Sequence, residues 1–145
     1  EEETITRLSR VGFDHTLGYL KGGIDAWKVA GKEADTVDSV NAEELKALVD
    51  KGVPVYDVRK ESEYKAEHVE DAHLTPLDYI NDHLSEFPEK ETFYVHCAGG
   101  YRSMIASSIL KSRGIHNLVD VSGGFADIKK AGIPVTDYIC PTTLK

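Results

Sequence analysis

The sequence predicts an α/β fold with a mainly parallel central sheet flanked by helices. Over about 100 residues, short apolar runs rich in β-branched and aromatic residues alternate with segments of helical periodicity. Residues 53–58 (VPVYDV) and 92–96 (TFYVH) are nearly continuous apolar runs, as is typical of strands buried on both faces of a parallel sheet. A chain of 145 residues with 41% hydrophobic residues suits one domain of ordinary size.

The elements that precede the central strand follow from caps and periodicity. A helix is predicted over residues 42–52, with Ser39 or Asn41 as its N-cap and Gly52 at its end. The strand over 53–58 follows it. The next predicted elements are a short helical segment within 60–69, a strand over 72–74 and a helix over 77–87.

The elements that follow the central strand complete the alternation. We expect a helix over residues 103–113, a strand over 117–121 and a final helix over 126–132. In the first of these helices, Ile105, Ile109 and Leu110 are expected to form the core face, and Ser103 and Ser107 to face differently.

The loop after the strand over residues 92–96 carries the candidate chemistry. Cys97 ends the strand, Ala98, Gly99, Gly100 and Tyr101 form a candidate anion cradle, and Arg102 follows. The two glycines can curl the loop so that its N–H groups point inward, and the next helix adds the positive end of its dipole. Both features, with the charge of Arg102, favour a nucleophilic thiolate at Cys97. The structural alternative is a buried cysteine before an ordinary glycine turn.

Other polar residues are weaker candidates. His96 precedes Cys97, but adjacent strand residues point to opposite faces, so it is not expected to reach the sulfur. Asp57 and Arg59 are placed at the end of a strand as supporting residues, with a structural ion pair favoured, and Ser103 can hydrogen-bond within the loop. His68 and His73 match no common ligand spacing, so no metal site is expected.

Three stretches in order resemble the rhodanese family. CAGGYR (97–102) is similar to its active-site loop, and GGFADIKKAGIPV (123–135) to its closing motif, except that Ile128 stands where the family usually has Trp. VYDVRKESEYKAEHVEDA (55–72) is similar to its N-terminal signature at Asp57, Arg59, Glu63, Tyr64, His68 and Ala72. The signature departs at Glu70-Asp71, where a glycine is common. The resemblance covers residues 38–141 and implies a three-layer rhodanese-like fold.

The resemblance implies sulfane sulfur transfer, without a cofactor, from a small anionic donor such as thiosulfate to a thiol or cyanide through a Cys97 persulfide. One alternative is a Cys-dependent phosphatase or arsenate reductase. Those families typically place five residues between Cys and Arg, whereas this loop has four, which suits a single sulfur atom. Another alternative is a non-catalytic interaction or regulatory module of a larger hydrolase.

Residues 1–37 contain a second motif. LKGGIDAWKVAGK (20–32) resembles VSGGFADIKKAGIPV (121–135), with Trp27 in the place of Ile128. Chance similarity is the alternative. We interpret residues 1–37 as the C-terminal remnant of an incomplete rhodanese-like repeat, and residues 142–145 as a loose tail. Such tandem architectures include fusions with an upstream metallo-β-lactamase-fold hydrolase. The apolar face of the remnant could instead pack on the main domain or pair two chains in a homodimer.

Charge and cysteine content restrict the class further. The net charge of −8, without a basic stripe, gives no indication of nucleic-acid or membrane partners. No apolar run approaches the length of a membrane span, and no signal peptide is visible. Cys97 and Cys140 lie far apart and form no CxxC, so neither a disulfide framework nor a zinc site is expected. A reducing, cytoplasmic location fits this pattern best.

Overall fold

The computed structural model describes residues 2–9 and 15–140. The chain divides into two compact units, residues 1–36 and 37–145. The described residues of the first unit contain two helices, α1 (Glu2–Ser9) and α2 (Gly23–Val29). The tail predicted over residues 142–145 lies outside the described residues. In the part of the chain that the structure describes, no helix is long and apolar enough to cross a membrane.

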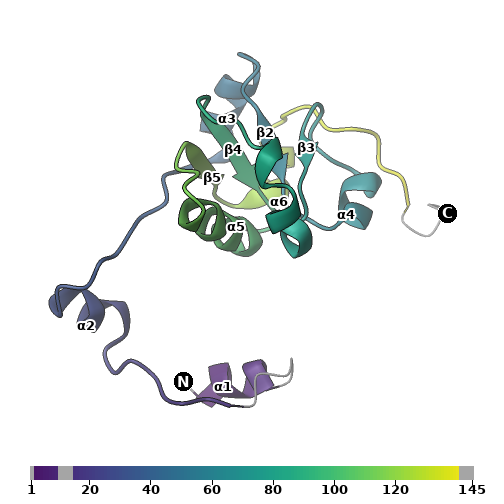
Figure 1. Cartoon of the computed structure of the whole chain (residues 1–145). Coiled ribbons are helices and arrows are strands. Elements are labelled where there is room, and N and C mark those ends of the chain that lie inside the picture. The colour runs from purple at the N-terminus through teal and green to yellow at the C-terminus, as the bar shows by residue number, and fades with distance from the viewer. Residues whose placement is uncertain (1, 10–14, 141–145) are drawn as a thin grey trace. The chain divides into compact units, whose positions relative to one another are not determined.

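The second unit is built on one parallel sheet of five short strands (Figure 1). The strand order is β1-β5-β4-β2-β3, and every pair is parallel, which confirms the predicted α/β fold. The strands are β1 (Ser39–Val40), β2 (Val55–Asp57), β3 (His73–Leu74), β4 (Phe93–His96) and β5 (Leu118–Val121). The two apolar runs predicted as strands contain β2 and β4, and both strands are buried along their whole length.

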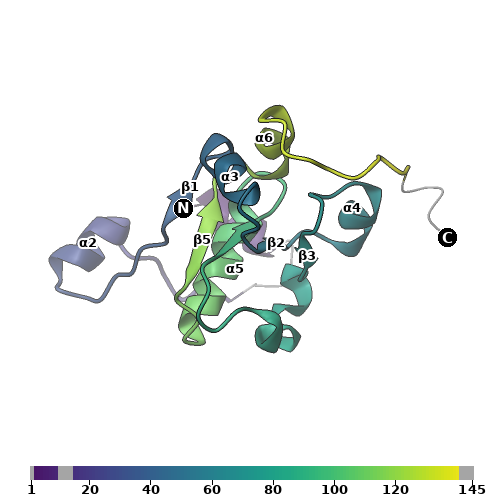
Figure 2. The same ribbon diagram turned by 90° about the horizontal axis from the view of Figure 1, so that it is seen from above.

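Helices cover both faces of the sheet and give it three layers. One core cluster joins the sheet to α3 (Ala42–Val49) and α6 (Gly124–Lys130), and the other joins it to α5 (Tyr101–Ser112). Figure 2 shows α3 and α6 on one side of the sheet and α5 on the other. The remaining helix, α4 (Glu61–Ala66), follows β2. Asn41 caps α3 in a capping box with Glu44, one of the two caps the sequence offered.

Two predictions about the helices were wrong. The segment 77–87 is not one helix but two 3₁₀ segments, Leu77–Asp82 and Leu84–Glu86, interrupted by non-helical backbone at Tyr79. Ile80 and Phe87 are nevertheless buried in the core, as their apolar spacing predicted. The hydroxyl of Tyr56 donates a 2.8 Å hydrogen bond to the carbonyl of Glu86 and holds this segment in place. Burial of these side chains therefore does not need a regular α-helix.

The second error concerns part of the predicted core face of α5: Leu110 is fully buried and Ile109 packs against the core, as expected, but Ile105 does not. The buried residues of α5 are Ser103, Ala106, Ser107 and Leu110, whereas Ile105 is 51% exposed. The helix also begins at Tyr101, earlier than predicted, so Arg102 lies in its first turn. The buried face of α5 therefore differs in part from the predicted one. The contacts of the loop before α5, described below, explain the difference, because they require Ser103 to point inward.

Candidate active site

Cys97 lies at the point where the connections of the sheet diverge. It follows β4, the central strand, and is 1% exposed. From β2 the chain continues to β3 on one side, and from β4 it continues to β5 on the other, so β2 and β4 form a topological switch point. In open α/β sheets such points, at the carboxyl ends of the strands, are where sites form. The fold therefore places Cys97 where a ligand site is expected.

Backbone N–H groups converge on the sulfur of Cys97. The N–H of Gly100 donates to Sγ at 3.1 Å, and Gly100 has a φ of +101°, which a side chain would disfavour. The backbone of Gly99 and of Ser103 also favours the ionised form of the sulfur, because both lower the pKa of Cys97. Ser103 is the third residue of α5, so its N–H is one of the four that lack a partner within the helix. The loop and the helix end together form a cradle for an anion.

These hydrogen bonds decide the ionisation of Cys97. Burial would raise the pKa of the thiol, but the hydrogen bonds from the backbone and hydroxyl of Ser103 and from Gly99 and Gly100 outweigh it and lower the pKa. The thiolate is the nucleophilic form of cysteine. The local structure therefore favours a reactive sulfur.

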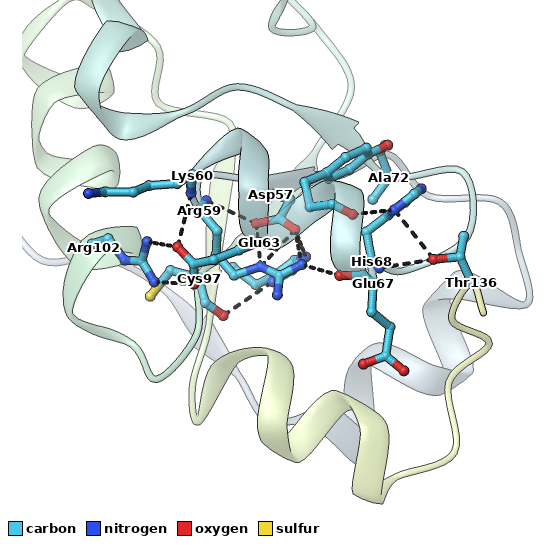
Figure 3. A network of polar contacts seen from close by, with 12 residues as sticks. Asp57, Arg59, Lys60, Glu63, Glu67, His68, Ala72, Cys97, Arg102 and Thr136 are labelled. Atoms are coloured by element: carbon cyan, nitrogen blue, oxygen red, sulfur yellow. Dashed lines mark hydrogen bonds and ion pairs between the residues drawn. The ribbon is translucent and has the colours of Figure 1, made fainter. Parts of the chain in front are cut away.

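Arg102 is held by Glu63 of α4. The two guanidinium nitrogens Nη1 and Nη2 lie 2.6 and 2.9 Å from the carboxylate oxygens of Glu63 (Figure 3). The hydrogen bond from Arg102 lowers the pKa of Glu63, and the same contact raises the pKa of Arg102. Both groups therefore stay charged, and the pair ties the start of α5 to α4. Arg102 keeps three further N–H groups for other contacts.

Asp57 and Arg59 form a second, buried ion pair. Arg59 places Nε and Nη2 on the Asp57 carboxylate at 2.6 to 2.9 Å and donates to the carbonyl of Glu67 at 2.8 Å. Its guanidinium carbon lies 3.9 Å from the centre of the Phe125 ring. Asp57 is fully buried and Arg59 is 5% exposed. The pair links the end of β2 to α4 and α6, as a structural ion pair would.

Comparisons with known proteins agree with this geometry. Residues 41–131 match the family described as the rhodanese-like domain. The chain belongs to this family. A rhodanese-like domain protein from Staphylococcus aureus is 32% identical, with a TM-score of 0.62 over 70% of this chain and 100% of that one.

Two curated relatives carry names that refer to sulfur transfer. A probable adenylyltransferase/sulfurtransferase of Mycobacterium tuberculosis is 30% identical over 59% of this chain and 23% of its own length. A tRNA sulfurtransferase of Thermoplasma acidophilum is 29% identical over 59% of this chain and 17% of its own length. The chain thus spans less than a quarter of the length of either relative.

The closing motif of the rhodanese-like domain packs against the loop that carries Cys97. The N–H of Phe125 donates to the carbonyl of Cys97 at 2.7 Å. A Cβ at Gly124 would lie 2.5 Å from that carbonyl oxygen and 2.7 Å from the carbonyl carbon of Ala98. Only glycine allows this backbone approach, and Gly124 also has a positive φ of +61°. Gly124 of this motif thus supports the loop that carries Cys97.

The histidines near the rhodanese-like site have structural positions. His96 is fully buried, its Nδ1 lies 3.3 Å from the carbonyl oxygen of Cys97, and burial lowers its pKa. His68 stacks on Tyr64 with ring centres 3.7 Å apart and has Nδ1 2.8 Å from the carbonyl of Tyr64. His73 stacks on Tyr56. These contacts involve carbonyl groups and rings rather than the sulfur of Cys97.

The structure brings the candidate residues together to different degrees. Gly100 donates to the sulfur, and Gly99 and Ser103 help to lower its pKa, whereas Tyr101 is 88% exposed and Ala98 is exposed. Sequence reasoning gave no role to Glu63, to Gly124 or to Phe125. Glu63 lies 39 residues before Arg102, and no local pattern pairs the two. For Gly124, the sequence offered one indication of a special role, the pair of glycines directly before the final helix.

Proposed function

We propose that this chain is a sulfurtransferase that moves sulfane sulfur from an anionic donor such as thiosulfate to a thiol or cyanide acceptor through a Cys97 persulfide. The observation that carries the proposal is the cradle of N–H donors around a buried cysteine whose pKa is lowered. Membership of the rhodanese-like family and the names of the two sulfurtransferase relatives support it.

The first half-reaction is an attack by the Cys97 thiolate on the outer sulfur of thiosulfate. A sulfur–sulfur bond forms to Cys97, the sulfur–sulfur bond of the donor breaks, and sulfite leaves with its electron pair. The enzyme keeps one negative charge, now on the outer persulfide sulfur. The N–H groups of Gly99, Gly100 and Ser103 are placed to stabilise that anion without reorganisation.

The second half-reaction returns the enzyme to its starting state. An acceptor thiolate or cyanide attacks the outer persulfide sulfur, and the electron pair of the broken bond returns to Cys97. The sulfite and thiolate leaving groups are anions, so this route needs no general base. The absence of a general base fits the position of His96, which is fully buried and lies with Nδ1 near the carbonyl oxygen of Cys97 rather than near its sulfur.

Arg102 has an electrostatic role in this proposal. Two of its N–H groups bind Glu63, so part of its charge is neutralised, and the others are available toward an anionic donor at the rim. Tyr101, exposed beside it, is in a position to contact the acceptor. The same surface would serve in the alternative, a non-catalytic rhodanese-like module of a larger hydrolase.

Steady-state kinetics test the catalytic proposal against its alternatives. With thiosulfate and cyanide varied together, a persulfide route gives parallel double-reciprocal lines, because the two substrates never share the site. Intersecting lines would refute the covalent intermediate, and absence of thiocyanate formation would favour the non-catalytic module. Hydrolysis of an aryl phosphate at a higher rate than sulfur transfer would favour a phosphatase.

We also propose that residues 1–37 are the C-terminal remnant of an incomplete rhodanese-like repeat. Local geometry supports it, because Gly22 and Gly23 have φ values of +87° and +57°, and Gly123 and Gly124 have +77° and +61°. Each pair leads into a seven-residue helix, α2 or α6, that ends at an alanine and a glycine of positive φ.

The apolar face of α2 lacks the cover that α6 has. Trp27 is 41% exposed, whereas Ile128, its counterpart, is fully buried. The main domain of the same chain, a preceding domain such as an upstream hydrolase, or a second chain would be the partner. Trp27 is the only tryptophan, so its emission reports on this face alone. A blue shift that grows with protein concentration, with dimers in sedimentation, would favour the homodimer. An unshifted emission in a monomer would contradict it.

A further inference from the structure

His96 is a fully buried histidine at the end of β4, directly before Cys97, and the sulfur-transfer steps do not use it. Its Nδ1 atom lies 3.3 Å from the carbonyl oxygen of Cys97. The backbone N–H of Phe125 donates to the same oxygen at 2.7 Å. A backbone carbonyl has two lone pairs, so it can accept both hydrogen bonds. The carbonyl of Cys97 is therefore held by a side chain of the sheet and by the start of α6.

The contact with the carbonyl determines which ring nitrogen of His96 carries the hydrogen. A carbonyl oxygen only accepts, so Nδ1 must be the donor, and Nε2 of the neutral ring then has a lone pair. Nε2 has no hydrogen-bond partner within residues 2–9 and 15–140 and lies 3.9 Å from the Asp57 carboxylate. Burial lowers the pKa of His96, and the charge of Asp57 is already paired with Arg59. The surroundings therefore favour a neutral ring with its hydrogen on Nδ1.

The ring of His96 is fixed by its neighbours. It stacks on the ring of Phe125, with centres 6.1 Å apart and planes inclined by 18°. The guanidinium of Arg59 lies over the same Phe125 ring. His96 pairs with Asp57 in the sheet register, and Tyr94, two residues earlier on the same face of the strand, belongs to the core cluster under α6. Packing in this layer therefore keeps Nδ1 directed at the carbonyl of Cys97.

The direction of the Cys97 carbonyl decides where the next N–H group points. In a planar trans peptide, the C=O and the following N–H point in opposite directions. The carbonyl of Cys97 points toward α6, whereas the side chain of Cys97 belongs to the core cluster on the α5 side of the sheet. The N–H of Ala98 therefore points toward the side on which the sulfur lies.

The next peptide group has the same arrangement. The carbonyl oxygen of Ala98 also faces Gly124, since a Cβ on that glycine would lie 2.7 Å from it. The N–H of Gly99 is at the opposite edge of this peptide, and the backbone of Gly99 helps to lower the pKa of Cys97. A peptide of this loop whose carbonyl faces α6 thus presents its N–H on the side of the sulfur.

We propose that His96 is a positioning residue, whose Nδ1–H holds the Cys97 carbonyl toward α6 and so keeps the Ala98 N–H directed at the sulfur and at the persulfide formed on it. This inference rests on the proposed function. Without the His96 donor, the N–H of Phe125 alone would hold the carbonyl, and the peptide between residues 97 and 98 would be freer to turn. A turned peptide would present its oxygen, which repels the anion, in place of its N–H.

His96→Asn and His96→Gln separate this role from a merely structural one. Asparagine places its amide N–H where Nδ1 lies, whereas glutamine places it where Nε2 lies, and both variants lose the ring. In single-turnover sulfur uptake, His96→Asn should stay within about twofold of the wild type and His96→Gln should be roughly fivefold slower, as expected for one lost hydrogen bond. Equal rates in the two variants, under conditions in which urea unfolding shows both to be folded, would overturn the proposal.

Two NMR measurements on the full-length protein need no sulfur donor. Nitrogen-15 spectra of the His96 ring should show the hydrogen on Nδ1 near neutral pH, and a hydrogen on Nε2 would refute the proposal. As Cys97 ionises, the amide proton of Ala98 should shift in the wild type and in His96→Asn, and shift less in His96→Gln. Equal shifts in all three proteins would contradict the role of His96. A protein that transfers no sulfur can still satisfy both measurements, and sulfur transfer with the hydrogen on Nε2 would refute this inference alone.

Discussion

The backbone N–H of Phe125 donates a 2.7 Å hydrogen bond to the carbonyl oxygen of Cys97. This bond joins the start of α6 to the proposed nucleophile, Cys97, and it requires close contact between Gly124 and residues 97–98. The loop is therefore held from both sides, by α5 through its N–H groups and by α6 through this contact.

Gly124→Ala should destabilise the protein and disturb the loop. Gly114→Ala is the control, because Gly114 also has a positive φ, of +88°, but a Cβ there meets nothing within 4 Å. Both substitutions should cost about 1 kcal/mol for the backbone conformation. Gly124→Ala should cost roughly 2 kcal/mol more from the clash. Urea unfolding measures both, and equal losses would show that the contact with Cys97 is unimportant.

Substitutions of Arg59 and Arg102 should have different effects, the first mainly on the stability of the fold and the second mainly on sulfur transfer. Arg59→Ala leaves Asp57 as an unpaired buried charge and should lower the free energy of unfolding by about 3 to 5 kcal/mol. Arg102 and Glu63 are about one-third exposed, so Arg102→Ala should cost only about 1 kcal/mol or less. Arg102→Ala should instead slow sulfur uptake from thiosulfate roughly tenfold, because a charged hydrogen-bond donor is lost.

Chemical denaturation and single-turnover sulfur uptake measure the two effects of these substitutions. The account would be contradicted if Arg102→Ala unfolded the protein as readily as Arg59→Ala while its sulfur uptake stayed normal. Arg102→Lys should recover little of the rate, since an ammonium group cannot pair with Glu63 through two parallel hydrogen bonds.

The Arg102–Glu63 pair should make stability depend on acid pH. The pKa of Glu63 is lowered in the folded state, so its contribution is present above its ordinary pKa and is lost as pH falls through the lowered value. The stability difference between the wild type and Glu63→Gln should therefore be constant near neutral pH and shrink in acid. Glu61→Gln, which removes an exposed pair with Lys65, should change stability by less than about 0.5 kcal/mol. A difference that persists in strong acid would contradict the ion-pair explanation.

Cys97 should ionise below the ordinary pKa of a thiol. In a Cys140→Ser background, the ultraviolet absorbance of the thiolate reports on Cys97 alone. The hydrogen bonds from Ser103, Gly99 and Gly100 predict that the thiolate forms at lower pH than in an unfolded chain, and that urea removes this shift. Titration at the ordinary thiol value in the folded protein would mean that the cradle does not stabilise the anion.

Much of the fold could be predicted because its signals are local. The apolar runs became β2 and β4, the cap at Asn41 was visible, and Cys97 with its glycines was found at the end of a strand. Whether a segment such as 77–87 forms an α-helix or 3₁₀ turns depends on what it packs against, and periodicity does not show this.

The site was less predictable because its partners are distant in sequence. Glu63 meets Arg102 only once α4 and α5 are placed by the sheet. The burial of Ser103 in place of Ile105 reverses what hydrophobicity predicts, since the sulfur cradle needs polar groups on the inner face of α5.

The most direct measurement is the intact mass of the purified protein after treatment with thiosulfate, with Cys97→Ala alongside. The account predicts a gain of one sulfur atom on the wild type, its removal by cyanide, and no gain on Cys97→Ala. A folded wild-type protein that gains no sulfur, or a gain that survives in Cys97→Ala, would contradict the persulfide at Cys97.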